Sequence, residues 1–96
     1  MQILNDEFRT KLREITKLSD KINKNDNRNI LEMMKEHIGE IEERYNNNVH
    51  WAIETADLIV LCYELLMLED KDIDDVFNRC LPRFDVKLKR SAENVS

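Results

Sequence analysis

Apolar residues recur at steps of three and four along the first half of the chain, which is the spacing of an amphipathic α-helix. One stripe runs through residues 4–22 and ends in the polar stretch 23–27, so a first helix is predicted there. A second stripe follows Asn29, which has Glu32 three residues later in the spacing of a capping box. Its apolar positions are Ile30, Met34, Ile38, Ile41 and Tyr45. The asparagines at 46–48 end this second helix and predict a turn.

Residues 49–69 predict a third helix that is apolar on almost every side from Leu58 onward, a pattern typical of a helix covered by other helices or by a second subunit. The charged stretch 69–72 predicts a turn, with Asp72 as the N-cap of a short fourth helix. Pro82 is expected to end or kink that helix, and residues 84–96 are expected to form a frayed tail. The predicted fold is an all-α bundle of about four helices in a single domain, residues 1–96, completed by oligomerisation.

The composition supports a helical protein and narrows the classes of ligand. The 96 residues include one Gly and one Pro, too few for a turn-rich β-sandwich or for Pro/Gly-rich disorder. The net charge is −5, without a basic block, which disfavours binding to the phosphate backbone of DNA or RNA. An anionic ligand would therefore need a metal ion as a bridge.

Cysteine usage and the N-terminal sequence indicate the compartment. Cys62 and Cys80 do not form a C-x-x-C motif, so neither a redox pair nor a zinc site is indicated, and the reducing cytoplasm is expected. Residues 1–10 carry charges and lack the apolar core of a signal peptide. The apolar stretch 58–68 is well below the about 20 residues of a membrane-spanning helix, so no membrane association is expected.

Candidate chemistry lies where the second and third helices face each other across the asparagine turn. His37 with Glu40, and Glu54 with Asp57, have i, i+3 spacing, so each pair projects from one side of its helix. An antiparallel arrangement brings the two pairs together. At about 100° per residue, His37 lies about 60° and Glu40 about 120° from the apolar stripe of the second helix, whereas Glu36 points farther away.

Oxygen and nitrogen ligands that converge from two helices form a site for a divalent cation, and such a cation allows an acidic protein to bind a triphosphate. The cation would also neutralise carboxylates that otherwise repel one another. The sequence therefore predicts a metal site made by His37, Glu40, Glu54 and Asp57.

The two segments that carry these pairs, EHIGEI at 36–41 and ETADLIV at 54–60, resemble the E-E-x-x-E and E-x-x-D motifs of the MazG-like, all-α nucleoside triphosphate pyrophosphohydrolases. The resemblance covers about residues 30–83, since 72–79 is similar to the short helix that follows the motif pair in that family. It implies that water cleaves a nucleoside or deoxynucleoside triphosphate between the α and β phosphates, with Mg²⁺ as cofactor and a monophosphate and pyrophosphate as products. It also implies a homodimer or homotetramer with sites in or near subunit interfaces.

The resemblance also implies roles for individual residues. By position, the family's metal ligands correspond to His37, Glu40, Glu54 and Asp57. Glu36 and Glu40 are the candidates for orienting or deprotonating the attacking water.

Substrate contacts are expected from the last helix and from the chain's single tryptophan. Arg79 and Arg83 are the candidates for holding phosphate oxygens. Trp51 is a candidate for stacking on the base, with packing beside the core as the alternative.

The chain departs from the family pattern at two positions. His37 replaces a glutamate, and imidazole is a poor ligand for Mg²⁺ but suits Mn²⁺, Co²⁺, Ni²⁺ or Zn²⁺. Three interpretations follow: a changed metal preference, Glu36 as a substitute ligand, or a degenerate site. Met33 stands where family members often have a basic residue, which weakens the case for tight phosphate binding.

Two other functions remain open on the sequence. A catalytically degenerate MazG-like scaffold or binding module would keep the bundle without turnover. A helical partner-binding protein, such as an antitoxin or adaptor, would use the apolar stretch 58–68 as an interface, and its carboxylates would be irrelevant to function.

Overall fold

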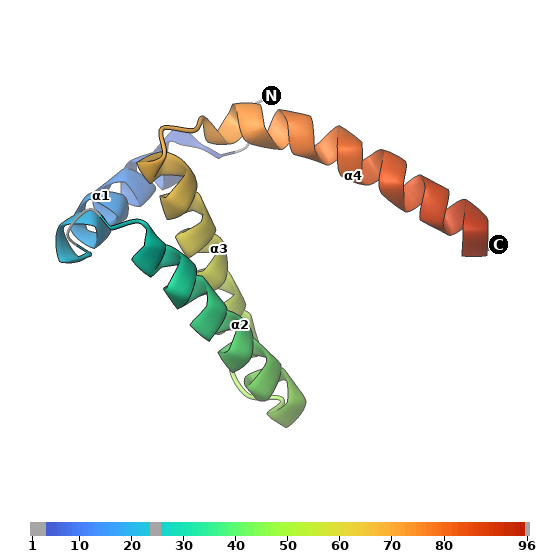
Figure 1. Cartoon of the computed structure of the whole chain (residues 1–96), viewed down its shortest axis with the longest axis horizontal. Helices are drawn as coiled ribbons and strands as arrows, with labels where there is room; N and C mark the ends of the chain where they lie inside the picture. Colours follow the sequence, from blue (N-terminus) through green and yellow to red (C-terminus); the bar gives the residue numbers. More distant parts are fainter. Residues whose placement is uncertain (1–3, 24–25, 96) are drawn as a thin grey trace.

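The structure, a computed structural model, describes residues 4–23 and 26–95 and is built there from four α-helices (Figure 1). They are α1 (Asp6–Ile22), α2 (Arg28–Asn47), α3 (Trp51–Leu68) and α4 (Ile73–Val95). The prediction of an all-α chain with about four helices is confirmed. Within the described residues, no helix is both long enough and apolar enough to cross a membrane.

The start of α2 differs from the predicted capping box. Asn29 lies inside the first helical turn, and the N-cap position belongs to Asn27. The Asn27 side chain donates to Glu69 Oε1 (2.8 Å) and caps no helical N–H group. The Arg28 N–H group instead donates to Asp26 Oδ1 (3.1 Å). The capping-box assignment is wrong because the Asp26 side chain reaches the start of the helix from farther upstream.

The asparagine turn between α2 and α3 is confirmed. Asn48 has left-handed backbone angles (φ 56°, ψ 41°), a region that asparagine enters more readily than most residues. The N–H groups of Asn48 and Val49 donate to carbonyl oxygens of the last turn of α2, at Tyr45 and Arg44. As a result, α2 and α3 pack side by side and antiparallel, and this hairpin positions the candidate site (Figure 1).

The face of α2 that contacts α3 includes only part of the predicted apolar stripe. Ile30 is fully buried, and the His37 side chain, on the same side of the helix, faces α3. Ile38 and Tyr45 were expected in the core but are 55% and 64% exposed. The core assignment of these two residues is wrong for the single chain, because α3 covers only the side of α2 that carries His37.

α3 is the central helix and contacts α1, α2 and α4. Leu61 is buried at this centre, but Ile53 and Ile59 on other sides of α3 are exposed. The single chain therefore leaves part of its most apolar helix uncovered. The apolar core is correspondingly small, since its buried side chains among the described residues are Leu12, Ile30, Leu61 and Ile73.

α4 begins as predicted but continues much farther. The Asp72 side chain accepts a hydrogen bond from the Asp75 N–H group (2.9 Å), which confirms Asp72 as the cap. The helix then passes through Pro82 and extends to Val95. The prediction that a short helix ends near Pro82 is wrong. Pro82 is exposed, so water can solvate the carbonyl that proline leaves unpaired, and the Lys- and Arg-rich residues that follow favour helix.

Two contacts attach the first turns of α4 to the other helices. Arg9 of α1 forms an ion pair with Asp74. The rings of Tyr63 on α3 and Phe77 on α4 meet edge to face, with centroids 5.9 Å apart. Beyond these contacts, all residues from 81 to 95 are exposed, and α4 projects from the rest of the chain as an arm (Figure 1).

A buried carboxyl group lies where α1 packs on α3. Glu64 is 4% exposed and accepts a hydrogen bond from Ser19 Oγ (3.1 Å). Burial raises the pKa of the Glu64 carboxyl, and the hydrogen bond from Ser19 acts in the opposite direction. The folded protein therefore favours the neutral form of this side chain.

This raised pKa makes stability fall as the pH rises. Because the folded pKa of Glu64 exceeds the ordinary value of 4.5, the folded state holds its proton more tightly, and stability is lost as the pH rises from that value through the folded pKa. We expect Glu64→Gln to raise the melting temperature at pH 8, where the wild type buries a charge, by about 4 °C or more. Thermal unfolding followed by circular dichroism from pH 4 to pH 8 measures this gain.

The matched control is Glu14→Gln, because Glu14 is exposed on α1 and its neutralisation removes no buried charge. Its effect should be small at every pH, and the gain for Glu64→Gln should shrink below pH 4.5. A gain for Glu64→Gln that stayed constant with pH would show that burial of charge is not its cause.

Candidate metal site in the helical hairpin

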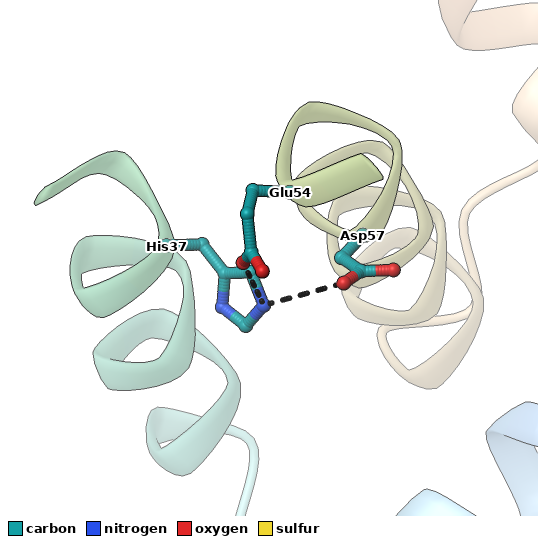
Figure 2. A group of neighbouring side chains, drawn as sticks. All are labelled: His37, Glu54 and Asp57. Atoms are coloured by element: carbon teal, nitrogen blue, oxygen red, sulfur yellow. Dashed lines mark ion pairs between the residues drawn. The ribbon is translucent and has the colours of Figure 1, made fainter. Parts of the chain in front are cut away.

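Three of the predicted ligands meet between α2 and α3. His37 lies on α2, and Glu54 and Asp57 lie one turn apart on α3, so all three side chains point into the same space (Figure 2). His37 Nε2 is 3.7 Å from Glu54 Oε2 and 3.9 Å from Asp57 Oδ2. One ligand atom from each of the three residues lies within 4.8 Å of the others. The i, i+3 pairing and the antiparallel hairpin thus bring these residues together as the sequence predicted.

A backbone hydrogen bond sets the orientation of the His37 ring. His37 Nδ1 is 2.9 Å from the carbonyl oxygen of Met33, one turn earlier on α2. A carbonyl oxygen can only accept, so the proton belongs on Nδ1, and in the neutral ring the Nε2 lone pair faces the two carboxylates. A hydrogen bond from the second nitrogen to a carbonyl is the usual way in which proteins orient a metal-binding histidine.

The donor set fits one divalent cation. An imidazole nitrogen and two carboxylate oxygens all present lone pairs, and only a cation or a proton on His37 can lie between them favourably. At metal–ligand distances of about 2.0–2.2 Å, two ligand atoms of one ion lie at most about 4.4 Å apart. The two separations from His37 already meet this limit. The two carboxylate oxygens lie within 4.8 Å of each other.

The site is closed on one side and open on the other. The side chain of Glu54 is 17% exposed and lies in the hairpin seam, whereas that of Asp57 is 52% exposed. A ligand therefore reaches the three residues from the Asp57 side.

The structure adds one basic residue that the sequence analysis did not select. Arg44, two helical turns after His37 on α2, has its Nε 3.7 Å from Glu54 Oε1. Its guanidinium is partly exposed, so N–H groups remain available to a ligand beside the site. The seven-residue spacing from His37 places both residues on one face of α2, and this spacing is the sequence signal that could have identified Arg44.

The two candidates for activating water lie on the exposed side of α2. Glu40 is one turn beyond His37 and Glu36 is adjacent to it, and both side chains are exposed. Glu40, predicted as a fourth ligand, is not part of the group formed by His37, Glu54 and Asp57. Its Cα position borders the site, but its side chain does not converge with the other three.

The candidates on α4 lie away from the hairpin. α4 leaves from the end of α3 that is opposite the asparagine turn, and it extends away from α2 (Figure 1). Arg79 pairs with Asp75 on its own helix (3.5 Å), and Arg83 is exposed. The structure therefore does not bring Arg79 or Arg83 to the site of the same chain.

Trp51 lies at the turn end of the hairpin, one turn before Glu54 on α3. Its ring meets that of Tyr45 edge to face, with centroids 5.5 Å apart, and both side chains remain exposed. One aromatic pair therefore borders the site on the side of the asparagine turn. Cys62 and Cys80 are free thiols, and burial raises the pKa of Cys62, which makes it less reactive.

Comparisons with models of protein families, with curated proteins and with solved structures found no match to this chain.

The geometry predicts which substitutions abolish metal binding. Mn²⁺ in excess should raise the melting temperature of the wild type by several degrees, because an ion that binds only the folded state stabilises it by mass action. His37→Ala and Asp57→Asn should lose most of that shift. Glu40→Gln is the matched control and should keep it, since Glu40 lies outside the group of three. An equal shift in wild type and His37→Ala would rule out this site.

Proposed function

We propose that this chain is a metal-dependent nucleoside triphosphate pyrophosphohydrolase of the MazG-like type. The observation that carries the proposal is the convergence of His37, Glu54 and Asp57 from the two segments that resemble the family's motif pair. His37 and Glu54, the nearest of these residues in different segments, are 17 positions apart in the sequence. Here they face each other across a turn, with their ligand atoms within 4.8 Å.

The donor set favours a particular class of metal. Mg²⁺ prefers an all-oxygen octahedron, whereas one imidazole and two carboxylates suit Mn²⁺, Co²⁺ or Zn²⁺. We therefore assign His37 as a ligand and expect Mn²⁺ or Co²⁺ to support activity better than Mg²⁺. When bound, the ion neutralises phosphate charge and acts as a Lewis acid at the phosphoryl group.

The residues of the chain supply the remaining steps. Glu54 in the hairpin seam and Asp57 at the opening would hold the cation together with His37. Glu40, on the rim beside His37, accepts the proton of the attacking water. Water adds to the α-phosphorus, the bond from that phosphorus to the bridging oxygen breaks, and pyrophosphate leaves with the electron pair. The products are a nucleoside monophosphate and pyrophosphate.

Phosphate binding is assigned to Arg44 and not to the arginines of α4. The Nε of Arg44 lies 3.7 Å from Oε1 of the candidate ligand Glu54, and its side chain is 42% exposed. Its remaining N–H groups would bind phosphate oxygens in the bidentate manner usual for a guanidinium. Arg79 and Arg83 would have to act on the site of another copy, because α4 projects away from its own hairpin.

Assembly of several copies belongs to the same proposal. The radius of gyration is 15.9 Å, compared with about 12.5 Å for a compact domain of this length. Large apolar side chains on α2, α3 and α4 are exposed, among them Ile38, Ile59 and Leu88. A homodimer or homotetramer would bury these surfaces and give the bundle the core that one chain lacks.

One observation favours the degenerate scaffold as a second candidate. Protonation of His37 lets it pair with both Glu54 and Asp57, which satisfies the group without a metal ion. The exposed position of Glu40 also leaves the group with three converging ligands. A metal-free structural cluster of this kind would hold the hairpin together without turnover.

The test is release of pyrophosphate from a panel of nucleoside and deoxynucleoside triphosphates with Mg²⁺, Mn²⁺ and Co²⁺. We expect pyrophosphate and monophosphate as products, and inorganic phosphate should not appear. Glu54→Gln and Asp57→Asn should each lower kcat by at least about 100-fold, because each removes a charge that holds the cation and substrate. Helix content by circular dichroism should stay unchanged.

The matched control is Glu14→Gln on α1, an exposed glutamate paired with Lys11, and it should keep full turnover. Retained turnover in Glu54→Gln or Asp57→Asn would disprove the site. No turnover by the wild type with any nucleotide and metal would favour the scaffold.

The role of Arg44 has its own kinetic signature. Arg44→Gln should raise KM for the triphosphate by about 10-fold or more, since it removes a charged phosphate contact, while the metal-induced shift in melting temperature persists. Arg13→Gln is the matched control, because Arg13 is exposed on α1 and has no part in the site. An unchanged KM in Arg44→Gln would contradict the assignment.

A further inference from the structure

We propose that the α4 arm of one chain packs along the outer surface of α2 in a second copy. The inference rests on the assembly included in the proposed function, and it adds the surfaces that form the contact. It does not depend on what chemistry the metal site performs. Three observations carry it: the area left exposed, the match between two apolar stripes, and the opposite charges beside them.

The accessible surface of the chain is larger than that of a compact monomer of the same mass. The accessible surface is 7702 Å², whereas a compact protein of 11.5 kDa exposes about 5,800 Å². The excess of about 1,900 Å² exceeds the about 800 Å² that each partner buries in a standard interface. The single chain therefore has enough uncovered surface for a stable, extensive contact.

The α4 arm carries an apolar stripe without cover in its own chain. Leu81, Phe84, Leu88 and Val95 follow helical spacing and lie on the same side as Phe77, which packs on Tyr63. Leu88 is 65% exposed and Phe84 58%. The stripe thus begins at the contact between Phe77 and Tyr63 and extends along α4 past the last residue that the rest of the chain covers.

α2 presents a matching stripe on its outer surface. Leu31, Ile38 and Tyr45 are spaced by seven residues and exposed, and Met34 lies beside them. Leu31, Met34 and Ile38 line an open groove whose rim is formed by the charged residues Arg28, Glu32 and Lys35. Leu31 to Tyr45 spans about 21 Å at 1.5 Å per residue, a length that the exposed part of α4 can follow.

The charges of the two helices are opposite on balance. On α4, Arg83 and Lys87 lie beside the apolar stripe on one side of it. On α2, the exposed Glu42 lies beside its stripe on the side turned away from α3, and Glu32 on that side pairs with Lys35 of the same helix (3.1 Å). The basic side of α4 is therefore expected to meet α2 near Glu42.

The charge of the whole chain selects a second copy as the occupant. Residues 79–96 contain five Lys or Arg and two Asp or Glu, whereas residues 1–78 contain ten and 18. A basic amphipathic helix can also bind an anionic membrane. Here, however, the acidic remainder of the same chain would be repelled from such a membrane, whereas it attracts the arm of another copy. Two arms exchanged around a two-fold axis give each copy the same contact.

Sedimentation velocity at micromolar concentration tests the contact. The wild type should be a dimer or larger, and Phe84→Asp, Leu88→Asp and Ile38→Asp should each raise the dissociation constant by about 100-fold or more. Val86→Asp is the matched control, because Val86 is equally exposed on α4 but lies on the opposite side from Phe84. It should assemble as the wild type does. Circular dichroism verifies that every variant remains helical.

Charge reversal tests the pairing itself. Arg83→Glu with Lys87→Glu should weaken assembly, and addition of Glu42→Lys with Glu43→Lys in the same chain should restore it, most strongly at low salt. Failure to restore assembly would overturn the proposed pairing of charges.

The outcomes separate this inference from the proposed function. A monomeric wild type would overturn both this contact and the proposed assembly, and binding of that monomer to anionic vesicles would make a membrane the occupant of α4. A dimer that survives Phe84→Asp and Leu88→Asp would overturn only the role of α4. A dimer that dissociates in those variants but survives Ile38→Asp would overturn only the role of α2.

Discussion

The left-handed turn at Asn48 is the constraint on which the candidate site depends. It reverses the chain in a few residues, and the hydrogen bonds from Asn48 and Val49 to the last turn of α2 fix where the reversal occurs. The register of α3 against α2 follows from that position. With a turn one residue longer, α3 would rotate by about 100° relative to α2, and Glu54 would no longer face His37. The metal site is therefore a consequence of the turn as much as of its ligands.

The helix content could be predicted from the sequence because it depends on local spacing, caps and breakers. The stripe at 4–22, the asparagine turn and the cap at Asp72 are all local signals, and the structure has each of them. The i, i+3 pairs predicted His37, Glu54 and Asp57 for the same reason, since spacing decides which side chains share a helix face. The prediction that the last helix ends at Pro82 was wrong. The free-energy cost of a proline inside a helix is offset there by solvation of the exposed backbone and by the strong helix formers that follow.

The rest of the site depends on tertiary contacts that a periodic pattern does not contain. The apolar stripe of α2 predicted the contact face only in part, because Ile30 is buried as expected, whereas the helix turns His37 towards α3 and leaves Ile38 exposed. With α2 in this orientation, Glu40 lies outside the group of His37, Glu54 and Asp57, and Arg44 lies beside Glu54. A helical wheel gives the angles between residues, but only the position of the neighbouring helix shows which angle is buried.

The orientation of α2 about its own axis explains both the polar site and the exposed apolar surface. By facing α3 with His37 and Arg44, α2 places polar groups in the seam of the hairpin, where apolar side chains would stabilise more. The displaced apolar residues, including Ile38, then form the outer stripe of α2. A helix with one functional face and one apolar face needs a neighbour on each. Within one chain α3 covers only the first, so the polar site and the need for another copy have the same structural origin.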